Sequence, residues 1–160
     1  MTVRRSTISD LAEMERIYAY AREQMKKNGN PNQWGDNMPL TEWLIKDIDE
    51  SVSYVIEEDG RICGTFMFFI GEDPDYGVIE DGQWLNDERY GVIHRIASDG
   101  TKKGVLEKAL AYCSSVITNL RIDTHHDNHI MQHLLDKNGF TQCGIIYVED
   151  GSPRIAYQRG

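Results

Sequence analysis

Two Asp-Gly pairs constrain the fold most strongly, because each stands between two segments with the composition of β-strands. Asp59-Gly60 separates SYVIEE from RICGTFMFFI, and Asp150-Gly151 separates FTQCGIIYVE from SPRIAYQR. Asp-Gly is a preferred pair for the tight turn of a β-hairpin, and the flanking segments are rich in β-branched and aromatic residues. The sequence therefore predicts two antiparallel hairpins, one in the first half of the chain and one at its end.

Four segments with helical spacing and three further strand-like segments surround these hairpins. Helical spacing is clearest where Leu11, Met14, Ile17 and Tyr18 fall on one stripe, and this helix should end at NGNPN, which cannot continue it. The acidic, turn-rich connector before YGVIHRIAS predicts at most one short strand, around Val78. The resulting order is β-α-α-β-β-β-α-β-α-β-β, which predicts an α/β (α+β) fold with a mixed sheet covered by helices. The other expected strands are 3–5, 90–98 and 120–124, and the expected helices are 11–28, 41–49, 104–118 and 128–137.

Composition narrows the class of protein. A chain of 160 residues predicts one domain over residues 1–160. Its net charge of −9 argues against a nucleic-acid partner, which would require a basic surface, and suits cationic small molecules. No apolar run is long enough to span a bilayer, and no signal peptide is evident at the start. Three cysteines without CxxC spacing favour a reducing cytoplasm, so we expect a cytoplasmic protein with no membrane partner.

The stretch LRIDTHHDNHIMQHLLDKNGF holds four of the five histidines and raises the question of a metal site. On a helix of 100° per residue, His129 and His133 fall opposite the apolar stripe of Met131 and Leu134. They form an i, i+4 pair, but the glutamate of the HExxH zinc motif is missing. A solvated helix face is therefore the favoured interpretation, with no metal, and a metal-dependent protein built on this cluster is the alternative.

Without its histidines, the same stretch resembles part of the acetyl-coenzyme A binding region of the GNAT acetyltransferase superfamily. In that family a strand is followed by an asparagine, an apolar residue three positions later, and a helix that ends in Gly-Phe. Asn128, Met131 and Gly139-Phe140 match this pattern in order and spacing. The element order of the whole chain also matches, so the resemblance implies a GNAT-like, mostly antiparallel central sheet flanked by helices.

A second signature of the family is a loop of the form Gln/Arg-x-x-Gly-x-Gly/Ala, whose backbone amides hold the pyrophosphate at a helix N-terminus. Gly104 fits this pattern, whereas Thr101 and Leu106 replace the usual residues at their positions. Lys102 and Lys103 add positive charge for phosphates. The resemblance thus implies that coenzyme A contacts Thr101, Lys102, Lys103, Gly104, Val105 and Leu106, with Asn128 and Met131 from the next unit and Ile96, Ala97 and Ser98 along the pantetheine arm.

His94 is the candidate general base. It precedes Ile96 by two residues, so both side chains fall on one face of the strand, and it resembles a histidine that one member of the family uses there. A histidine pKa lies near 6.5, which suits removal of a proton from an ammonium ion. A half-buried structural histidine is the alternative. The family's usual tyrosine acid is replaced by Leu135, and Tyr147 and Tyr112 are the remaining candidates.

The resemblance places the acceptor between the connection of the first two helices and the central strands. This nominates Gln33, Trp34, Glu80 and Trp84, since aromatic walls with carboxylates suit a cationic amine. We therefore expect an acetyl-coenzyme A-dependent N-acetyltransferase that acts on a primary amine of a small molecule or peptide. The alternative is a catalytically weak or inactive acyl-coenzyme A binding protein with the same fold. A homodimer is compatible with either, and the sequence identifies neither the acceptor nor the general acid.

Overall fold

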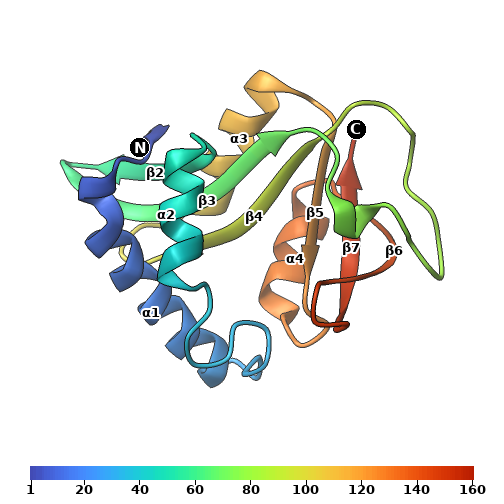
Figure 1. The fold of residues 1–160 in the computed structure, drawn as a ribbon, viewed down its shortest axis with the longest axis horizontal. Coiled ribbons are helices and arrows are strands. Elements are labelled where there is room, and N and C mark those ends of the chain that lie inside the picture. Colours follow the sequence, from blue (N-terminus) through green and yellow to red (C-terminus); the bar gives the residue numbers. More distant parts are fainter.

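The computed structural model describes all 160 residues, and its elements follow the predicted order (Figure 1). Two short 3₁₀ turns, η1 at Ile8–Asp10 and η2 at Pro74–Tyr76, are added to it. The strands are β1 Thr2–Arg5, β2 Ser53–Glu58, β3 Arg61–Ile70, β4 Gly91–Ser98, β5 Leu120–Thr124, β6 Thr141–Tyr147 and β7 Pro153–Arg159. The helices are α1 Leu11–Lys27, α2 Thr41–Asp49, α3 Val105–Val116 and α4 His129–Lys137.

Both predicted hairpins are confirmed, and their Asp-Gly pairs form different turns. Asp59 and Gly60 both have positive φ values, 55° and 75°, as the two-residue type I′ turn between β2 and β3 requires. In the second hairpin only Gly151 has a positive φ, 84°, and the Val148 amide donates to the Ser152 carbonyl across a three-residue loop. Both turns allow their strands to pair antiparallel, β2 with β3 and β6 with β7.

The seven strands form one sheet in the order β1-β2-β3-β4-β5-β7-β6. Every neighbouring pair is antiparallel except β4 and β5, which are parallel. Helices cover both faces, with α1 and α2 on one and α3 and α4 on the other (Figure 1). The predicted fold class, a mixed and mostly antiparallel sheet flanked by helices, is confirmed.

The two faces of the sheet carry separate apolar cores. The larger core joins α3 and α4 to the strands through residues such as Leu110 and Leu135. A smaller core holds α1 and α2 on the opposite face through Ile17 and Leu44. These contacts fix the position of the helices relative to the strand ends, where the candidate site lies.

The connector between β3 and β4 is the part that the sequence described least well. A short strand was expected around Val78, but Val78 is exposed and only an isolated bridge pairs Glu80 with Ile145. The segment instead packs through aromatic contacts, with Tyr76 against Trp84 at 5.1 Å between ring centroids. None of the helices combines the length and apolar character needed to cross a membrane.

Candidate active site

The site begins where β4 and β5 separate. These parallel strands pair only at Gly91 with Leu120 and at Val92 with Arg121, and beyond Val92 they diverge (Figure 1). The rest of β4, from Ile93 to Ser98, therefore has no strand partner on the β5 side. This leaves a polar backbone edge at the centre of the sheet, where a ligand can pair with it.

A β-bulge reshapes this part of β4. Pairing with β3 jumps from Met67 opposite His94 to Thr65 opposite Ala97, and Arg95 in between has a φ of 53°. The Tyr18 hydroxyl donates to the Arg95 carbonyl at 2.7 Å. A strained backbone of this kind persists only where the surroundings hold it.

The Arg95 side chain is held just as firmly. Its guanidinium forms a bidentate ion pair with Asp47 of α2, with Nη2 lying 2.7 Å from Oδ2 and 2.9 Å from Oδ1. The Trp43 ring also lies 5.8 Å from this guanidinium. Arg95 therefore fixes the bulge to α2, and because of the bulge the consecutive side chains of His94, Arg95 and Ile96 all line one cavity.

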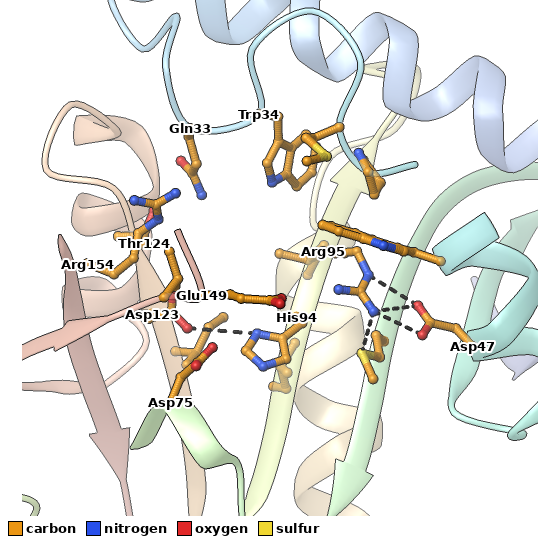
Figure 2. A pocket seen from close by; sticks show the side chains of 18 of the residues that line it. Gln33, Trp34, Asp47, Asp75, His94, Arg95, Asp123, Thr124, Glu149 and Arg154 are labelled. Atoms are coloured by element: carbon orange, nitrogen blue, oxygen red, sulfur yellow. Dashed lines mark hydrogen bonds and ion pairs between the residues drawn. The ribbon is translucent and has the colours of Figure 1, made fainter. Parts of the chain in front are cut away.

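That cavity has a volume of about 720 Å³, and we call it the acceptor cavity. One wall is aromatic. Trp34 comes from the connection between α1 and α2, and Trp43 comes from the first turn of α2. The opposite wall carries carboxylates from three separate segments, and Figure 2 shows Asp75, Asp123 and Glu149 gathered around His94.

Negative charges gather at this wall and raise the pKa of one of its carboxyl groups. The pKa of Asp75 is raised by burial and by the negative charges of Asp73, Asp123 and Glu149. A positively charged ligand would relieve this repulsion, so the wall is suited to an ammonium group.

His94 lies at the centre of this wall and contacts two carboxylates. Its Nε2 is 2.6 Å from Asp73 Oδ2, and its Nδ1 is 3.8 Å from Asp123 Oδ2. Burial lowers the pKa of His94, but the hydrogen bond that it donates to Asp73 and the charges of both aspartates outweigh this effect, so the pKa is raised above its usual value. Asp123 also accepts a hydrogen bond of 2.6 Å from the Tyr76 hydroxyl.

These contacts fix the tautomer of the neutral imidazole. The pKa of Asp73 is lowered, because the hydrogen bond and charge of His94 outweigh the effect of burial, so Asp73 is ionised and can only accept. Nε2 of His94 must then carry the hydrogen, which leaves the Nδ1 lone pair free to accept a proton. Asp73, Tyr76 and Asp123 were not identified from the sequence.

A second cavity, of about 300 Å³, lies between α1 and the start of α4 and is lined by Ile96, Ala97 and Ser98. We call it the donor groove. It shares Met25, Ile96 and Asn128 with the acceptor cavity, so the two spaces meet at these residues. Predicted cofactor residues from β4 and from α4 are thereby brought together.

The Asn128 side chain links the two parts of this junction. Its Oδ1 accepts from the Met131 amide at 3.1 Å and caps α4, while its Nδ2 donates to Gln33 Oε1 at 3.0 Å. Gln33 and Trp34 both line the acceptor cavity, and Met131 lines it from α4.

The predicted pyrophosphate loop connects β4 to α3. Gly104 is the N-cap of α3 with a φ of 79°, a conformation that favours glycine. The Thr101 amide and hydroxyl both bond to Asp99, whereas none of the backbone amides from Lys102 to Leu106 donates to an acceptor in the protein. Val105 and Leu106 are buried, so they contribute amides here and side chains to the core.

The structure places two of the predicted acceptor residues outside the acceptor cavity. The Trp84 ring packs on Tyr76 and lies 4.1 Å from the Arg121 guanidinium, so it anchors the connector. Glu80 pairs with Ile145 and accepts from the exposed Tyr147 hydroxyl. The expectation that Glu80 and Trp84 line the cavity is therefore corrected. The same connector contributes Asp75 to the cavity instead.

No tyrosine takes the place of the usual general acid in this cavity. Leu135 is completely buried in the larger core, and Tyr112 packs against Tyr54 in that core. Tyr147 is exposed and bonds to Glu80.

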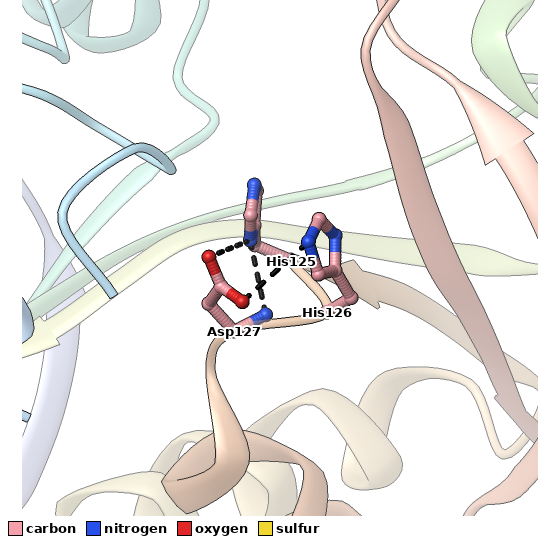
Figure 3. A group of neighbouring side chains, drawn as sticks. All are labelled: His125, His126 and Asp127. Atoms are coloured by element: carbon pink, nitrogen blue, oxygen red, sulfur yellow. Dashed lines mark hydrogen bonds and ion pairs between the residues drawn. The ribbon is translucent and has the colours of Figure 1, made fainter. Parts of the chain in front are cut away.

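The other histidines lie outside the acceptor cavity. His129 and His133 are exposed on α4, as the helical spacing predicts. Before this helix, His125 and His126 stack with ring centroids 4.2 Å apart beside Asp127 (Figure 3). His125 Nδ1 accepts from the Asp127 amide at 3.0 Å, so this ring already stabilises the turn that leads into α4.

Comparisons with known proteins point to one family. The family model described as "Acetyltransferase (GNAT) family" matches residues 14–140, which include β4, the loop to α3 and Asn128. No curated protein matches the sequence. A GNAT family acetyltransferase from Streptococcus agalactiae is 29% identical over 99% of this chain and 94% of its own, with a TM-score of 0.89.

Two further solved structures share the fold at lower identity. A GNAT family acetyltransferase from Bacillus cereus is 20% identical over 98% of this chain and 94% of its own, with a TM-score of 0.63. Naa20 from Chaetomium thermophilum, solved in complex with a bisubstrate analogue, is 16% identical over 99% of this chain and 86% of its own, with a TM-score of 0.64.

Proposed function

The chain belongs to the GNAT acetyltransferase family, and from this premise we propose that it transfers an acetyl group from acetyl-coenzyme A to a primary amine. The acceptor is an amine of a small molecule or peptide. The observation that carries this proposal is the meeting of two unlike cavities at Met25, Ile96 and Asn128. The donor groove follows the open edge of β4, and the acceptor cavity presents carboxylates and His94.

The donor groove and the loop that leads into α3 together fit coenzyme A. Free amides from Lys102 to Leu106 lie at the N-terminus of α3, where the helix dipole also favours an anion, so they suit a pyrophosphate. Lys102 and Lys103 are exposed beside them and add positive charge. Ile96, Ala97 and Ser98 line the groove beside the unpaired edge of β4, which suits the amide groups of a pantetheine arm.

When bound, acetyl-coenzyme A supplies an acetyl group activated as a thioester. The open edge of β4 offers backbone donors to an oxygen that gains negative charge. The carboxylate wall holds the acceptor as an ammonium ion beside His94, and Nδ1 of the neutral imidazole takes the first proton that this ion must lose. Attack of the free amine on the thioester carbon forms the N–C bond and breaks the C–S bond, and the second proton of the amine goes to the departing thiolate. Asp123 stabilises the imidazolium that results, because its carboxylate lies 3.8 Å from Nδ1.

A thiol-release assay with acetyl-coenzyme A and a panel of amines tests the proposal. The panel contains polyamines, amino acids, aminoglycosides and peptides with free N-termini, and mass spectrometry locates the acetyl group on the product. We expect release that depends on an amine, with the acetyl group on nitrogen. Tight binding of coenzyme A without transfer to any acceptor would instead support the alternative of an acyl-coenzyme A binding protein.

A further inference from the structure

Arg154 is the least compensated buried charge in the acceptor cavity. It lies on β7, only 9% of its surface is exposed, and it lines the cavity. Its one hydrogen bond runs from Nη1 to the carbonyl of its neighbour Pro153 at 3.0 Å, and it forms no salt bridge. Because a buried charge is costly unless it is paired, a guanidinium in this position indicates an anionic partner.

Two other arginines show how this protein otherwise compensates such a charge. Arg95, in the same cavity, forms a bidentate ion pair with Asp47. Arg121 is buried like Arg154 and also lacks a carboxylate, but it lies between Trp84 at 4.1 Å and Tyr90 at 3.9 Å and donates to the Asn86 carbonyl. Arg154 has neither an ion pair nor an aromatic partner.

A buried polar group without any hydrogen-bond partner lies beside it. The Thr124 hydroxyl lines the same cavity, its residue is only 1% exposed, and it has no hydrogen bond within the protein. Figure 2 shows Arg154, Thr124 and Gln33 together on one side of the cavity, apart from the ion pair of Arg95 with Asp47. We call these three residues the Arg154 corner.

We infer that the Arg154 corner binds a carboxylate of the acceptor, so that the acceptor is an aminocarboxylate such as an amino acid. The inference rests on the proposed function and specifies the substrate class of its acceptor cavity. A guanidinium offers paired donors that match the two oxygens of a carboxylate, and the Thr124 hydroxyl can add a further donor. The carboxylates near His94 are then left for the ammonium group.

The charge of the cavity favours a carboxylate over a phosphate. Six carboxylate residues line the cavity, against three lysines and arginines. A doubly charged phosphate would be repelled by this excess more strongly than a singly charged carboxylate. The carboxylates are Asp47, Glu50, Asp75, Asp123, Glu149 and Asp150, and the basic residues are Lys46, Arg95 and Arg154.

Matched acceptors that differ only in the carboxylate test the inference. Lysine is compared with cadaverine, phenylalanine with phenethylamine, and serine with both ethanolamine and phosphoethanolamine. We expect kcat/KM to be about ten- to hundredfold higher for the preferred amino acid than for its decarboxylated partner, the range that one hydrogen-bonded charge pair provides. Arg154→Gln should remove this preference by lowering kcat/KM for the amino acid far more than for the decarboxylated amine, and Arg154→Lys should keep part of it.

Arg89→Gln is the matched control, because it makes the same change of charge at an exposed position outside the cavity. It should leave the preference intact. A wild-type preference for the decarboxylated amine or for phosphoethanolamine would overturn the inference. An equal fall in kcat/KM for an amino acid and its decarboxylated partner, in both Arg154→Gln and Arg154→Lys, would also overturn it, since that result indicates a structural role.

Thermal shift measurements with coenzyme A and the same compounds give a readout that does not depend on catalysis. The corner would be supported, even if no acceptor were acetylated, if an amino acid stabilises the wild type and its decarboxylated partner does not. This selective stabilisation should be lost in Arg154→Gln. Absence of acetylation alone would count against the proposed function. Absence of selective stabilisation as well would overturn the corner.

Discussion

Replacing Asp73 with asparagine tests the role of the aspartate that orients His94. The substitution removes the charge that lies 2.6 Å from His94 Nε2. The local turn should survive, because the amide oxygen of asparagine can still accept from the Asp75 amide, which now bonds to Asp73 Oδ1 at 2.9 Å. The backbone amide of residue 73 also keeps its bond to the Tyr90 hydroxyl.

The stability change should depend on pH. The pKa of His94 is raised in the folded protein above its unfolded value of about 6.5, so the pair stabilises the fold fully below that pH, as long as Asp73 is ionised. This contribution is lost as the pH rises through the raised pKa. A hydrogen bond between charged groups contributes about 1.5–3 kcal/mol, and both side chains are mostly buried.

Asp73→Asn should therefore lower the free energy of unfolding by about 1.5–3 kcal/mol near pH 5.5. For a chain of this length that corresponds to a fall in Tm of about 3–12 °C. At pH 9 the fall should be smaller, because only a neutral hydrogen bond is then lost. Glu72→Gln, an exposed neighbour in the same loop, should show no such difference between the two pH values.

The same variant should change the pH dependence of acetyl transfer. Without the charge of Asp73 the pKa of His94 falls, so the rising limb of kcat/KM should move to lower pH. The plateau should fall as well, because the Nε2–H tautomer is no longer held. His94→Gln should lower kcat/KM by about 10²–10⁴, the usual contribution of a positioned acid or base.

Two results would refute this reasoning. The first is an equal loss of stability in Asp73→Asn at pH 5.5 and pH 9. The second is a rising limb that keeps its position in both variants, because the limb would then follow the pKa of the amine, and His94 would be a structural residue.

Three further substitutions test other parts of the site. Gly104→Glu should weaken coenzyme A binding in calorimetry by about tenfold or more, because it adds a negative charge and strain at an anion site. Gly151→Glu, also at a positive φ, should not weaken it, and equal affinities of the two variants would contradict the placement of the pyrophosphate at Gly104. Changing His129 and His133 together to Gln should leave metal content and acetyl transfer unchanged, since both are exposed, and loss of a stoichiometric zinc ion would contradict this. Leu135→Ala should reduce the free energy of unfolding by about 2–5 kcal/mol, because Leu135 is completely buried. Leu135→Tyr should reduce it by about 1–3 kcal/mol without raising kcat, and a gain in kcat would show that this position can supply an acid.

The elements of the fold could be predicted because their signals are local. β-Branched and aromatic residues on both sides of an Asp-Gly turn identify β2 and β3, and the limits of α2 and β5 agree with their apolar spacing and flanking residues. The separation of β4 from β5 could not be read in this way. It depends on which residues of two distant strands pair, and the sequence carries no local signal for that choice.

The residues of the candidate site also differ in whether the sequence carries a local signal for them. His94 was found because it lies on a predicted strand that leads into a recognisable loop. Asp73 and Tyr76 were missed because they belong to an aperiodic connector, and only the tertiary fold brings them to His94 and Asp123. Asp123 is the one partner with a usable signal, since it lies on β5, the strand parallel to β4.

The residues after β6 that line the cavity could not be predicted from the sequence either. Arg154 follows the turn of a hairpin, where an arginine is ordinarily exposed, and nothing local distinguishes it from Arg159 on the same strand. Its significance comes from being buried in a cavity without an ion pair.

A crystal structure of the protein with coenzyme A tests the central claim most directly, namely that donor and acceptor meet where β4 separates from β5. We predict that the pyrophosphate accepts hydrogen bonds from the amides between Lys102 and Leu106, and that the thiol lies at the junction formed by Ile96 and Asn128. A pyrophosphate bound elsewhere, or a thiol directed away from His94 and the acceptor cavity, would contradict the account.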